Sequence, residues 1–353
     1  MKPRSHVIDI PTIFSIERGA RHDVARLLKR EGLNRVAIFF DKAMKVIYGA
    51  DLEVSLRSEG IRFHSYCMDT LDYAQIANYS FSLPSDVEVI LALGGGKTID
   101  GAKYIAFIKK LPFISVPTSS SNDGFSSPVA SLIVNGHRTT VPAAGPYGII
   151  IDLDIIANAP AMFIYSGIGD LMSKITALWD WKFESQHIDV PYDDFAVMIA
   201  QKAVNSFVSL SSFDFKDSHF LSEFLYSLCM NGIAMEICGS SAPASGSEHL
   251  ISHAMDKISK TPYLHGMQVG ISTYLVSLLQ KNQTDDINRV YDTIGFWREV
   301  KALKIPRQLV HEAIDIAPSI KPQRHTILHE KEYREQAQAL LITDKILKEV
   351  LVD

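Results

Sequence analysis

Short apolar runs alternate with amphipathic helical patterns along the first 150 residues. Strands are predicted at residues 35–40, 62–67, 87–93, 113–116 and 149–152, and helices at residues 22–31, 43–58, 72–82 and about 97–109. This alternation is typical of a parallel sheet covered by crossover helices. We also expect an edge strand at 7–16, and a hairpin at 131–141 that turns at Asn135 and Gly136.

The pattern changes after Pro160. From Tyr165 onward apolar residues recur at helical spacing, and hardly any segment has strand character. The sequence therefore predicts an α/β, Rossmann-like nucleotide-binding domain at residues 1–160 and an all-helical, metal- and substrate-binding domain at residues 161–353. A chain of 353 residues is long enough for two domains of ordinary size.

Composition and charge narrow the class of protein. The chain is 47% hydrophobic and 21% charged, which is typical of a globular protein and argues against disorder. The net charge is −5 and the sequence has no basic run, so we expect no nucleic-acid partner. Three cysteines without CxxC spacing predict reduced thiols in a cytoplasmic protein. The absence of a signal peptide and of a long apolar run predicts no membrane insertion.

A glycine-rich turn follows the strongest strand pattern. Gly94, Gly95, Gly96 and Lys97 separate the apolar run at 87–93 from a helix. Glycine lets the backbone approach a pyrophosphate closely, and a helix N-terminus offers unpaired N–H groups to its charge. The turn therefore predicts phosphate binding. The competing interpretation is that a tight turn needs glycines for its geometry alone.

Two further strand ends carry polar side chains. Residues 118–121 offer hydroxyl groups after the strand at 113–116, and Asp41 follows the strand at 35–40. An acidic residue in this position accepts hydrogen bonds from the adenosine ribose and repels a 2′-phosphate, which favours NAD without excluding NADP. The alternatives are an ordinary polar loop and a helix N-cap at Asp41.

Three histidines lie within residues 240–270. His249 and His253 are four residues apart in a helical pattern, so their imidazoles project from one face. His265 follows a break at Pro262 and begins the next helix. Neutral imidazole is the commonest protein ligand of divalent metals, although surface and satisfied core histidines are common too.

A carboxylate would complete a metal site with these histidines. We expect Asp170, which follows Gly167 and Gly169, to cap the N-terminus of a helix. Together with His249 and His265 it would give one carboxylate and two imidazoles, a set that leaves open positions for substrate. Capping alone is the competing interpretation.

Five motifs in register resemble the sn-glycerol-1-phosphate dehydrogenases, which share a superfamily with glycerol dehydrogenase, iron-containing alcohol dehydrogenases and dehydroquinate synthase. The motifs are GGGKTID at 94–100, PTSSSNDGFSSP at 117–128, SGIGDLMSK at 166–174, SEHLISHAMD at 247–256 and HGMQVG at 265–270. The resemblance covers about residues 8–275. It implies a dehydroquinate synthase-like fold, an enzyme of phospholipid biosynthesis that uses NAD or NADP with a small phosphorylated substrate, and a homo-oligomer.

The resemblance also implies roles for individual residues. Asp123, in contact with substrate and nicotinamide, and His253, in contact with substrate, would be catalytic. Asp170, His249 and His265 would bind Zn²⁺, although the donor set also suits Ni²⁺ or Fe²⁺. The cofactor would be bound by Asp41, Gly94, Gly95, Gly96, Lys97, Thr98, Thr118, Ser119, Ser121 and Ser127.

The implied reaction is reversible hydride transfer between nicotinamide C4 and C2 of dihydroxyacetone phosphate, which gives sn-glycerol 1-phosphate. A metal would polarise the C2 oxygen, while His253 would relay a proton or orient the substrate. Lys97, His137 and Arg138 are candidates for binding the substrate phosphate. The alternatives are a dehydrogenase of an unphosphorylated polyol such as glycerol, a dehydroquinate synthase-like cyclase, and a non-catalytic nucleotide-binding protein.

Overall fold

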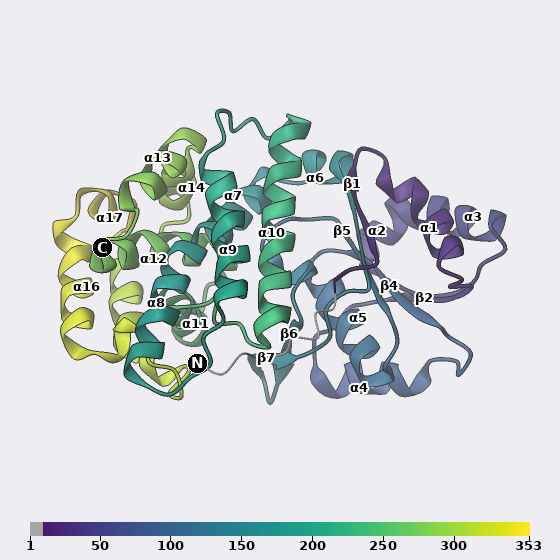
Figure 1. Ribbon diagram of the computed structural model, residues 1–353, viewed down its shortest axis with the longest axis horizontal. Coiled ribbons are helices and arrows are strands. Elements are labelled where there is room, and N and C mark those ends of the chain that lie inside the picture. Colours follow the sequence, from purple (N-terminus) through teal and green to yellow (C-terminus); the bar gives the residue numbers. More distant parts are fainter. Residues whose placement is uncertain (1–9) are drawn as a thin grey trace. The chain divides into compact units, whose positions relative to one another are not determined.

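The computed structural model describes residues 10–353, and the chain divides into two compact units, Met1–Ala161 and Met162–Asp353 (Figure 1). The beginning of the expected edge strand, residues 7–9, lies outside the described residues. Between residues 10 and 353, no helix has both the length and the apolar character needed to cross a membrane.

The first unit is built on a six-stranded parallel sheet with the strand order β1-β8-β5-β4-β2-β3. Its strands are β1 (Ile13–Glu17), β2 (Arg35–Phe40), β3 (Arg62–Cys67), β4 (Val89–Gly94), β5 (Phe113–Pro117) and β8 (Gly148–Asp152). A separate antiparallel hairpin joins β6 (Val129–Val134) to β7 (His137–Pro142). The parallel sheet and the hairpin at Asn135 and Gly136 are therefore confirmed, and β1 lies at the sheet edge as expected.

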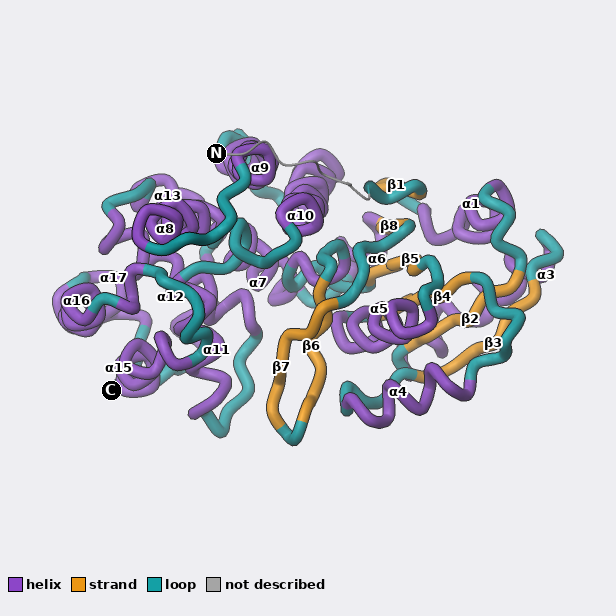
Figure 2. Tube along the Cα trace, turned by 60° about the horizontal axis from the view of Figure 1, so that its bottom comes forward, coloured by secondary structure: helices purple, strands orange, loops and turns teal. Residues whose placement is uncertain are grey.

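Helices cover both faces of this sheet (Figure 2). One face carries α1 (Val24–Arg30) and α3 (Ala50–Ser58), and the other carries α4 (Tyr73–Ser82) and α5 (Gly96–Lys109). Burial on both faces explains why the inner strands β2, β4, β5 and β8 are nearly continuous buried runs rather than alternating ones.

The helix expected at 43–58 is interrupted. It begins as α2 (Lys42–Met44), passes through a π-helical turn at Lys45–Gly49 and continues as α3. Likewise, the helix expected at 22–31 begins with a 3₁₀ turn at Ala20–Asp23 before α1. The apolar pattern predicts that these segments are helical, but it does not specify such local changes of helical pitch.

The sheet order places a switch point between β2 and β4. The chain leaves β2 for β3 on one side, whereas β4, β5 and β8 follow on the other. Phe40 pairs with Leu93, so Asp41 and Gly94 come next at the same edge of the sheet. Ligands of open α/β sheets bind at such a switch point, beyond the carboxyl ends of the strands. The predicted ribose and pyrophosphate positions therefore adjoin each other.

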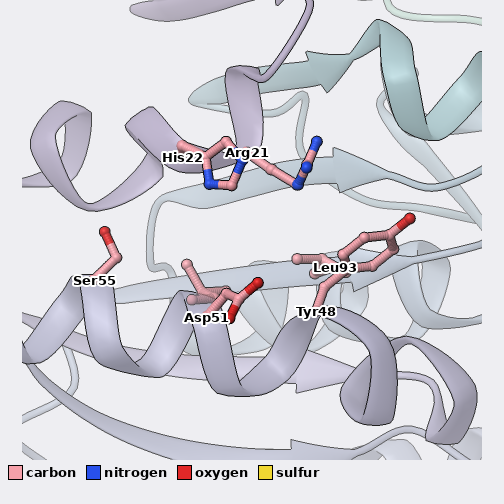
Figure 3. Close-up of a pocket in the computed structure, with 7 residues that line it drawn as sticks. Arg21, His22, Tyr48, Asp51, Ser55 and Leu93 are labelled. Atoms are coloured by element: carbon pink, nitrogen blue, oxygen red, sulfur yellow. The ribbon is translucent and has the colours of Figure 1, made fainter.

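A hollow in the first unit is lined by other residues, namely Arg21, His22, Tyr48, Asp51, Leu52, Ser55 and Leu93 (Figure 3). The guanidinium of Arg21 lies 5.7 Å from the ring centre of Tyr48 and is paired with Asp152. None of the predicted cofactor residues lines this hollow. Arg21 is thus engaged with other groups of the same unit.

The second unit is helical within the described residues, apart from an isolated bridge between Pro306 and Val352. The long helices α9 (Asp194–Val208) and α10 (Ser218–Cys238) pack along each other, as do α11 (Ser247–Ile258) and α12 (His265–Gln280). The remaining helices are α7 (Ala161–Met172), which begins at the unit boundary, α8 (Lys174–His187), α13 (Thr284–Ile294), α14 (Phe296–Ala302), α15 (Arg307–Ile316), α16 (Lys331–Thr343) and α17 (Lys345–Val350). The short α6 (Leu153–Asn158) belongs to the first unit.

Candidate cofactor and metal sites

The glycine turn forms an open helix N-terminus. Gly95 precedes α5 in an extended conformation and gives it no side-chain cap. A Cβ atom on Gly94 would lie 2.7 Å from Thr98, whereas one on Gly96 would meet nothing within 4 Å. Gly94 is thus required by packing, while Gly96 leaves space above the first N–H groups of α5. That combination suits a bound phosphate.

Buried hydroxyl groups surround this turn. Thr118 donates its backbone N–H to Gly94 O at 3.0 Å, which holds the end of β5 against the turn. Among the described residues, Thr98 Oγ1 and Ser120 Oγ are buried and have no hydrogen-bond partner. An unsatisfied buried hydroxyl costs free energy, so partners from a ligand would relieve that cost. Lys97 is exposed.

Asp123 and Ser127 lie in one compact turn. Its 3₁₀ segment, Asp123–Phe125, is capped by Asn122, which accepts the N–H of Gly124 at 2.9 Å. Asp123 O accepts the N–H groups of Ser126 and Ser127 at 3.0 and 3.2 Å. Asp123 Oδ2 is buried. The turn therefore fixes the backbone on which both predicted site residues are carried.

Asp41 caps α2 by accepting the N–H of Met44 at 2.9 Å. The capping role considered for this residue is thus present. Only Oδ1 takes part in that bond. Asp41 is half-buried at the switch point, which is compatible with an additional contact to ribose.

Asp170 lies inside a helix and does not cap one. The prediction that it begins a helix is wrong, because α7 runs from Ala161 to Met172 and contains both Gly167 and Gly169. A Cβ atom on Gly169 would lie 2.1 Å from Gly266 O, and one on Gly266 would lie 1.8 Å from Ser166 O. The glycines therefore permit backbone contact between α7 and α12 rather than breaking α7.

This helix contact brings the metal-ligand candidates together. Asp170 follows Gly169 on α7, and His265 precedes Gly266 on α12, while α11 supplies His249. One donor atom from each of Asp170, His249 and His265 lies within 4.8 Å of the others. His249 Nε2 and Asp170 Oδ1 are 3.4 Å apart. Two ligands of a tetrahedral ion at bond lengths of about 2.0–2.1 Å are separated by a similar distance. The donor set therefore fits a divalent metal.

Glu248 fixes the proton position of His249. This fully buried carboxylate accepts three hydrogen bonds. The donors are Nδ1 of His249 at 2.9 Å, the N–H of Gly246 at 2.6 Å and Oγ1 of Thr176 at 2.8 Å. Burial would raise the pKa of Glu248, but its hydrogen bonds, above all the one from His249, lower it. An ionised carboxylate only accepts, so Nδ1 of His249 carries a proton, and Nε2, which faces Asp170, is the nitrogen that a metal would bind.

A chain of three hydrogen bonds determines the proton position of His265. Gln268 Nε2 donates to Asp256 Oδ1 at 3.0 Å, which orients the amide so that Oε1 faces Ser252. Ser252 Oγ donates to that oxygen at 2.7 Å and lies 3.2 Å from His265 Nδ1. Because the Ser252 proton is already used, Nδ1 of His265 donates to Ser252. A metal would then bind His265 through Nε2.

Lys174 compensates the charge of Asp170. It is fully buried one helical turn after Asp170, with Nζ 3.5 Å from Asp170 Oδ1 and donating to Asp170 O at 2.8 Å. Burial would raise the pKa of Asp170, but Lys174 first, and then His249 and His265, lower it below its ordinary value. Asp170 is therefore ionised, as a metal ligand must be.

His253 lies beside the metal-ligand candidates without being one of them. Its ring centre is 5.5 Å from that of His265 and 6.2 Å from that of His249. Donor atoms of His253, Asp256 and His265 also lie within 4.8 Å of one another. His253 is half-buried, whereas Asp256 is exposed. A half-buried imidazole beside a metal site is suited to contact a substrate or relay a proton.

Comparison with known proteins decides the family. The chain is 35% identical over 349 residues to the glycerol-1-phosphate dehydrogenase [NAD(P)+] of Methanothermobacter thermautotrophicus, which covers 96% of this chain and 98% of the relative. The chain belongs to the glycerol-1-phosphate dehydrogenase family. Another member, from Metallosphaera sedula, is 37% identical over 243 residues, or 69% of each chain. Residues 15–160 also match the family model described as iron-containing alcohol dehydrogenase.

Solved structures show the same fold. The glycerol dehydrogenase of Schizosaccharomyces pombe has a TM-score of 0.77 at 19% identity, covering 96% of this chain and 91% of the other. The sulfoacetaldehyde reductase of Bifidobacterium kashiwanohense, solved in complex with NAD⁺, has a TM-score of 0.75 at 14% identity, covering 98% and 100%. This member of the glycerol-1-phosphate dehydrogenase family thus has the fold of glycerol dehydrogenases and iron-containing alcohol dehydrogenases, as the sequence predicted.

Sequence reasoning did not identify the residues that support the predicted sites in this family member. They are Lys174, Glu248, Ser252, Asp256 and Gln268. Two local signals were present: Glu248 adjoins His249, and Lys174 follows Asp170 by one helical turn. The contact of Ser252 with residues 265 and 268 instead depends on how α11 and α12 pack.

Proposed function

We propose that this protein is a metal-dependent, NAD(P)-linked oxidoreductase that interconverts dihydroxyacetone phosphate and sn-glycerol 1-phosphate by hydride transfer. The observation that carries the proposal is the convergence of Asp170, His249 and His265 in a chain that belongs to the glycerol-1-phosphate dehydrogenase family. The open N-terminus of α5 and the buried hydroxyls of Thr98 and Ser120 support dinucleotide binding in the first unit.

We assign Zn²⁺ to the site formed by Asp170, His249 and His265, a donor set that also accepts Ni²⁺ or Fe²⁺. Bound there, the ion supplies a Lewis acid that stabilises negative charge on the C2 oxygen of the substrate. Asp170 contributes charge, and the two histidines contribute Nε2 lone pairs whose availability Glu248 and Ser252 secure.

The remaining roles are assigned to residues around these two sites. His253 orients the substrate and relays the proton that balances hydride transfer, because its imidazole lies beside the metal ligands. Asp123 contacts the substrate and the nicotinamide. The pyrophosphate binds the turn from Gly94 to Thr98. The cofactor site is completed by Thr118, Ser119, Ser121 and Ser127. Asp41 accepts hydrogen bonds from the ribose hydroxyls, which favours NAD.

The function is tested by following the absorbance of NADH or NADPH with zinc-loaded protein and dihydroxyacetone phosphate. We expect oxidation of the cofactor that is lost after chelation and recovered with Zn²⁺. His265→Ala should abolish turnover, whereas His311→Ala, which changes another half-buried helical histidine outside the donor set, should not. Ni²⁺ and Fe²⁺ added to the metal-depleted enzyme establish which ion supports the fastest turnover.

Other substrates separate the competing functions. Equal turnover of unphosphorylated dihydroxyacetone would identify a polyol dehydrogenase. Phosphate release from a phosphorylated substrate without net oxidation of NADH would identify a cyclase of the dehydroquinate synthase type. Bound cofactor without turnover of any of these substrates would identify a non-catalytic nucleotide-binding protein.

We further propose that the enzyme acts as a homo-oligomer in the cytoplasm. The compartment is supported by Cys67, Cys229 and Cys238, all of which are free thiols in this structure. The assembly is proposed from the resemblance to a superfamily of oligomeric enzymes. Light scattering coupled to size-exclusion chromatography measures the mass in solution, and a monomer mass would contradict the assembly.

A further inference from the structure

A buried lysine anchors the turn that carries Asp123. Lys103 lies on α5 and is completely inaccessible to solvent. Its Nζ donates to Gly124 O and, at 2.8 Å, to Val129 O. Lysine is almost never fully buried without partners that use its donors. Here the two acceptors lie at the beginning and the end of one short segment, so a single side chain holds both ends of it.

The Ser127 hydroxyl makes longer contacts with the same carbonyl groups that Lys103 binds. Ser127 Oγ lies 3.4 Å from both Gly124 O and Val129 O. One hydroxyl has one proton and cannot satisfy both acceptors. With Lys103 supplying both hydrogen bonds, the Ser127 hydroxyl is not required by either carbonyl. Lys103 therefore also determines whether Ser127 is available to a ligand.

Two carboxylates near Lys103 complete the arrangement. Asp100, one turn earlier on α5, has Oδ1 3.8 Å from Nζ. Asp123 interacts electrostatically with the same ammonium. The helix that begins at the glycine turn is thus joined through Lys103 both to the Asp123 turn and to Val129, the first residue of β6.

We propose that Lys103 is a positioning residue, which fixes Asp123 and Ser127 relative to the glycine turn at the N-terminus of α5. This inference rests on the proposed function, because it assigns Lys103 to the geometry of the dinucleotide and substrate contacts. The two bonds need only N–H donors, which the amine provides in either protonation state. The role therefore follows from hydrogen-bond geometry and burial.

Lys103→Met tests the proposal, since methionine has a similar length but no donor. Lys109→Met is the matched control, because it lies at the end of the same helix and has no role in the turn. Hydrogen–deuterium exchange of residues 122–129 should become about tenfold faster only in Lys103→Met. With dihydroxyacetone phosphate, kcat should fall about 10- to 100-fold, since misplaced catalytic groups typically cost this much. Unchanged exchange, or faster exchange with unchanged kcat, would overturn the positioning role.

Chemical rescue provides a second test, which remains available if Lys103→Met folds poorly. In Lys103→Ala the missing atoms correspond to n-propylammonium. This amine should restore slow hydrogen–deuterium exchange of residues 122–129. It should also raise kcat at least about fivefold, because it reverses part of the loss expected from misplaced catalytic groups. n-Propanol, with one donor, should restore less. Failure of the amine to restore either property overturns the proposal. If the wild-type enzyme does not turn over dihydroxyacetone phosphate, the proposed function fails instead, while the exchange measurements still decide whether Lys103 anchors the turn.

Discussion

His249 and His265 are prepared for metal binding by residues that are not ligands themselves. Glu248 accepts the Nδ1 proton of His249, and Ser252 accepts that of His265. In both cases the hydrogen bond places a ring proton on Nδ1, so that Nε2 is the nitrogen through which an ion would bind. The free energy of metal binding should therefore depend on Ser252 although its hydroxyl is not a donor to the ion.

Ser252→Ala tests this dependence. Removal of the hydroxyl leaves Nδ1 of His265 and Oε1 of Gln268 without their partner. We expect zinc affinity to fall by about 10- to 100-fold, the usual effect of losing such a supporting group. Competition with a chelating dye measures it. Ser277→Ala, which removes another buried hydroxyl of the same unit, is the control. Equal zinc affinity in the two variants would contradict the role of Ser252.

At the scale of elements, the metal site depends on backbone contact between α7 and α12. Residues 170 and 265 each adjoin a glycine of this contact, Gly169 and Gly266. A longer distance between the helices would separate the carboxylate from the imidazole. The glycines of the SGIGD and HGMQVG motifs are therefore explained by packing, and the ligands next to them by metal chemistry.

Gly266→Ala should separate these helices, because its Cβ atom would lie 1.8 Å from Ser166 O. We expect a loss of about 1–3 kcal/mol in the free energy of unfolding, as for overpacked cores, together with weaker zinc binding. Gly96→Ala is the control, since nothing lies within 4 Å of its added methyl group. Denaturant unfolding and zinc titration measure both effects. Normal zinc affinity in Gly266→Ala would show that the contact does not position the ligands.

Asp152 joins two further elements through its charge. Its buried carboxylate accepts the N–H groups of Gly19 and Asp154 at 3.0 and 2.9 Å, and it is paired with Arg21. Burial would raise the pKa of Asp152, but these hydrogen bonds, above all the one from Arg21, lower it below its ordinary value. Asp152 thus stabilises the fold above the pKa of the unfolded chain, and this contribution is lost as pH falls through the lower folded-state pKa.

Asp152→Asn should therefore cost about 1.5–3 kcal/mol of unfolding free energy at neutral pH, the usual value for hydrogen bonds to a charged group. The difference from wild type should shrink as pH falls below about 4, where the unfolded aspartate becomes protonated. Urea unfolding at a series of pH values measures this. Asp154→Asn, at an exposed ion pair, should have a much smaller effect. A difference that stays constant down to pH 2 would exclude the charge of Asp152 as the cause.

For the whole molecule, the sequence predicted what depends on local pattern. Apolar runs such as 35–40 identified the inner strands, because these are buried on both faces. Asp170 was misplaced because glycines in a helical pattern resemble a boundary, and the contact that explains Gly169 comes from Gly266, far along the chain. Lys103 was missed for the same reason: its acceptors are carbonyl oxygens on another segment, and no side-chain pattern marks them.

The two units should respond to different ligands. The predicted metal ligands all belong to Met162–Asp353, and the predicted cofactor residues all belong to Met1–Ala161. At a hundred times its Kd, zinc should stabilise the folded protein by about 2.7 kcal/mol, which raises Tm by roughly 5–10 °C in a unit of about 200 residues. His265→Ala should lose this rise but keep the rise produced by NAD(P)H.

Thr98→Val should lose much of the rise in Tm produced by NAD(P)H but keep the rise produced by zinc, the reverse of His265→Ala. Because Thr98 Oγ1 is buried without a partner among the described residues, its replacement by a methyl group should leave the ligand-free protein as stable as wild type or slightly more so. The rise with NAD(P)H should shrink, since the hydroxyl is then missing for the cofactor, and the rise with zinc should remain. Differential scanning calorimetry with each ligand measures all four responses. Loss of both rises in either variant would mean that the two sites do not bind their ligands independently.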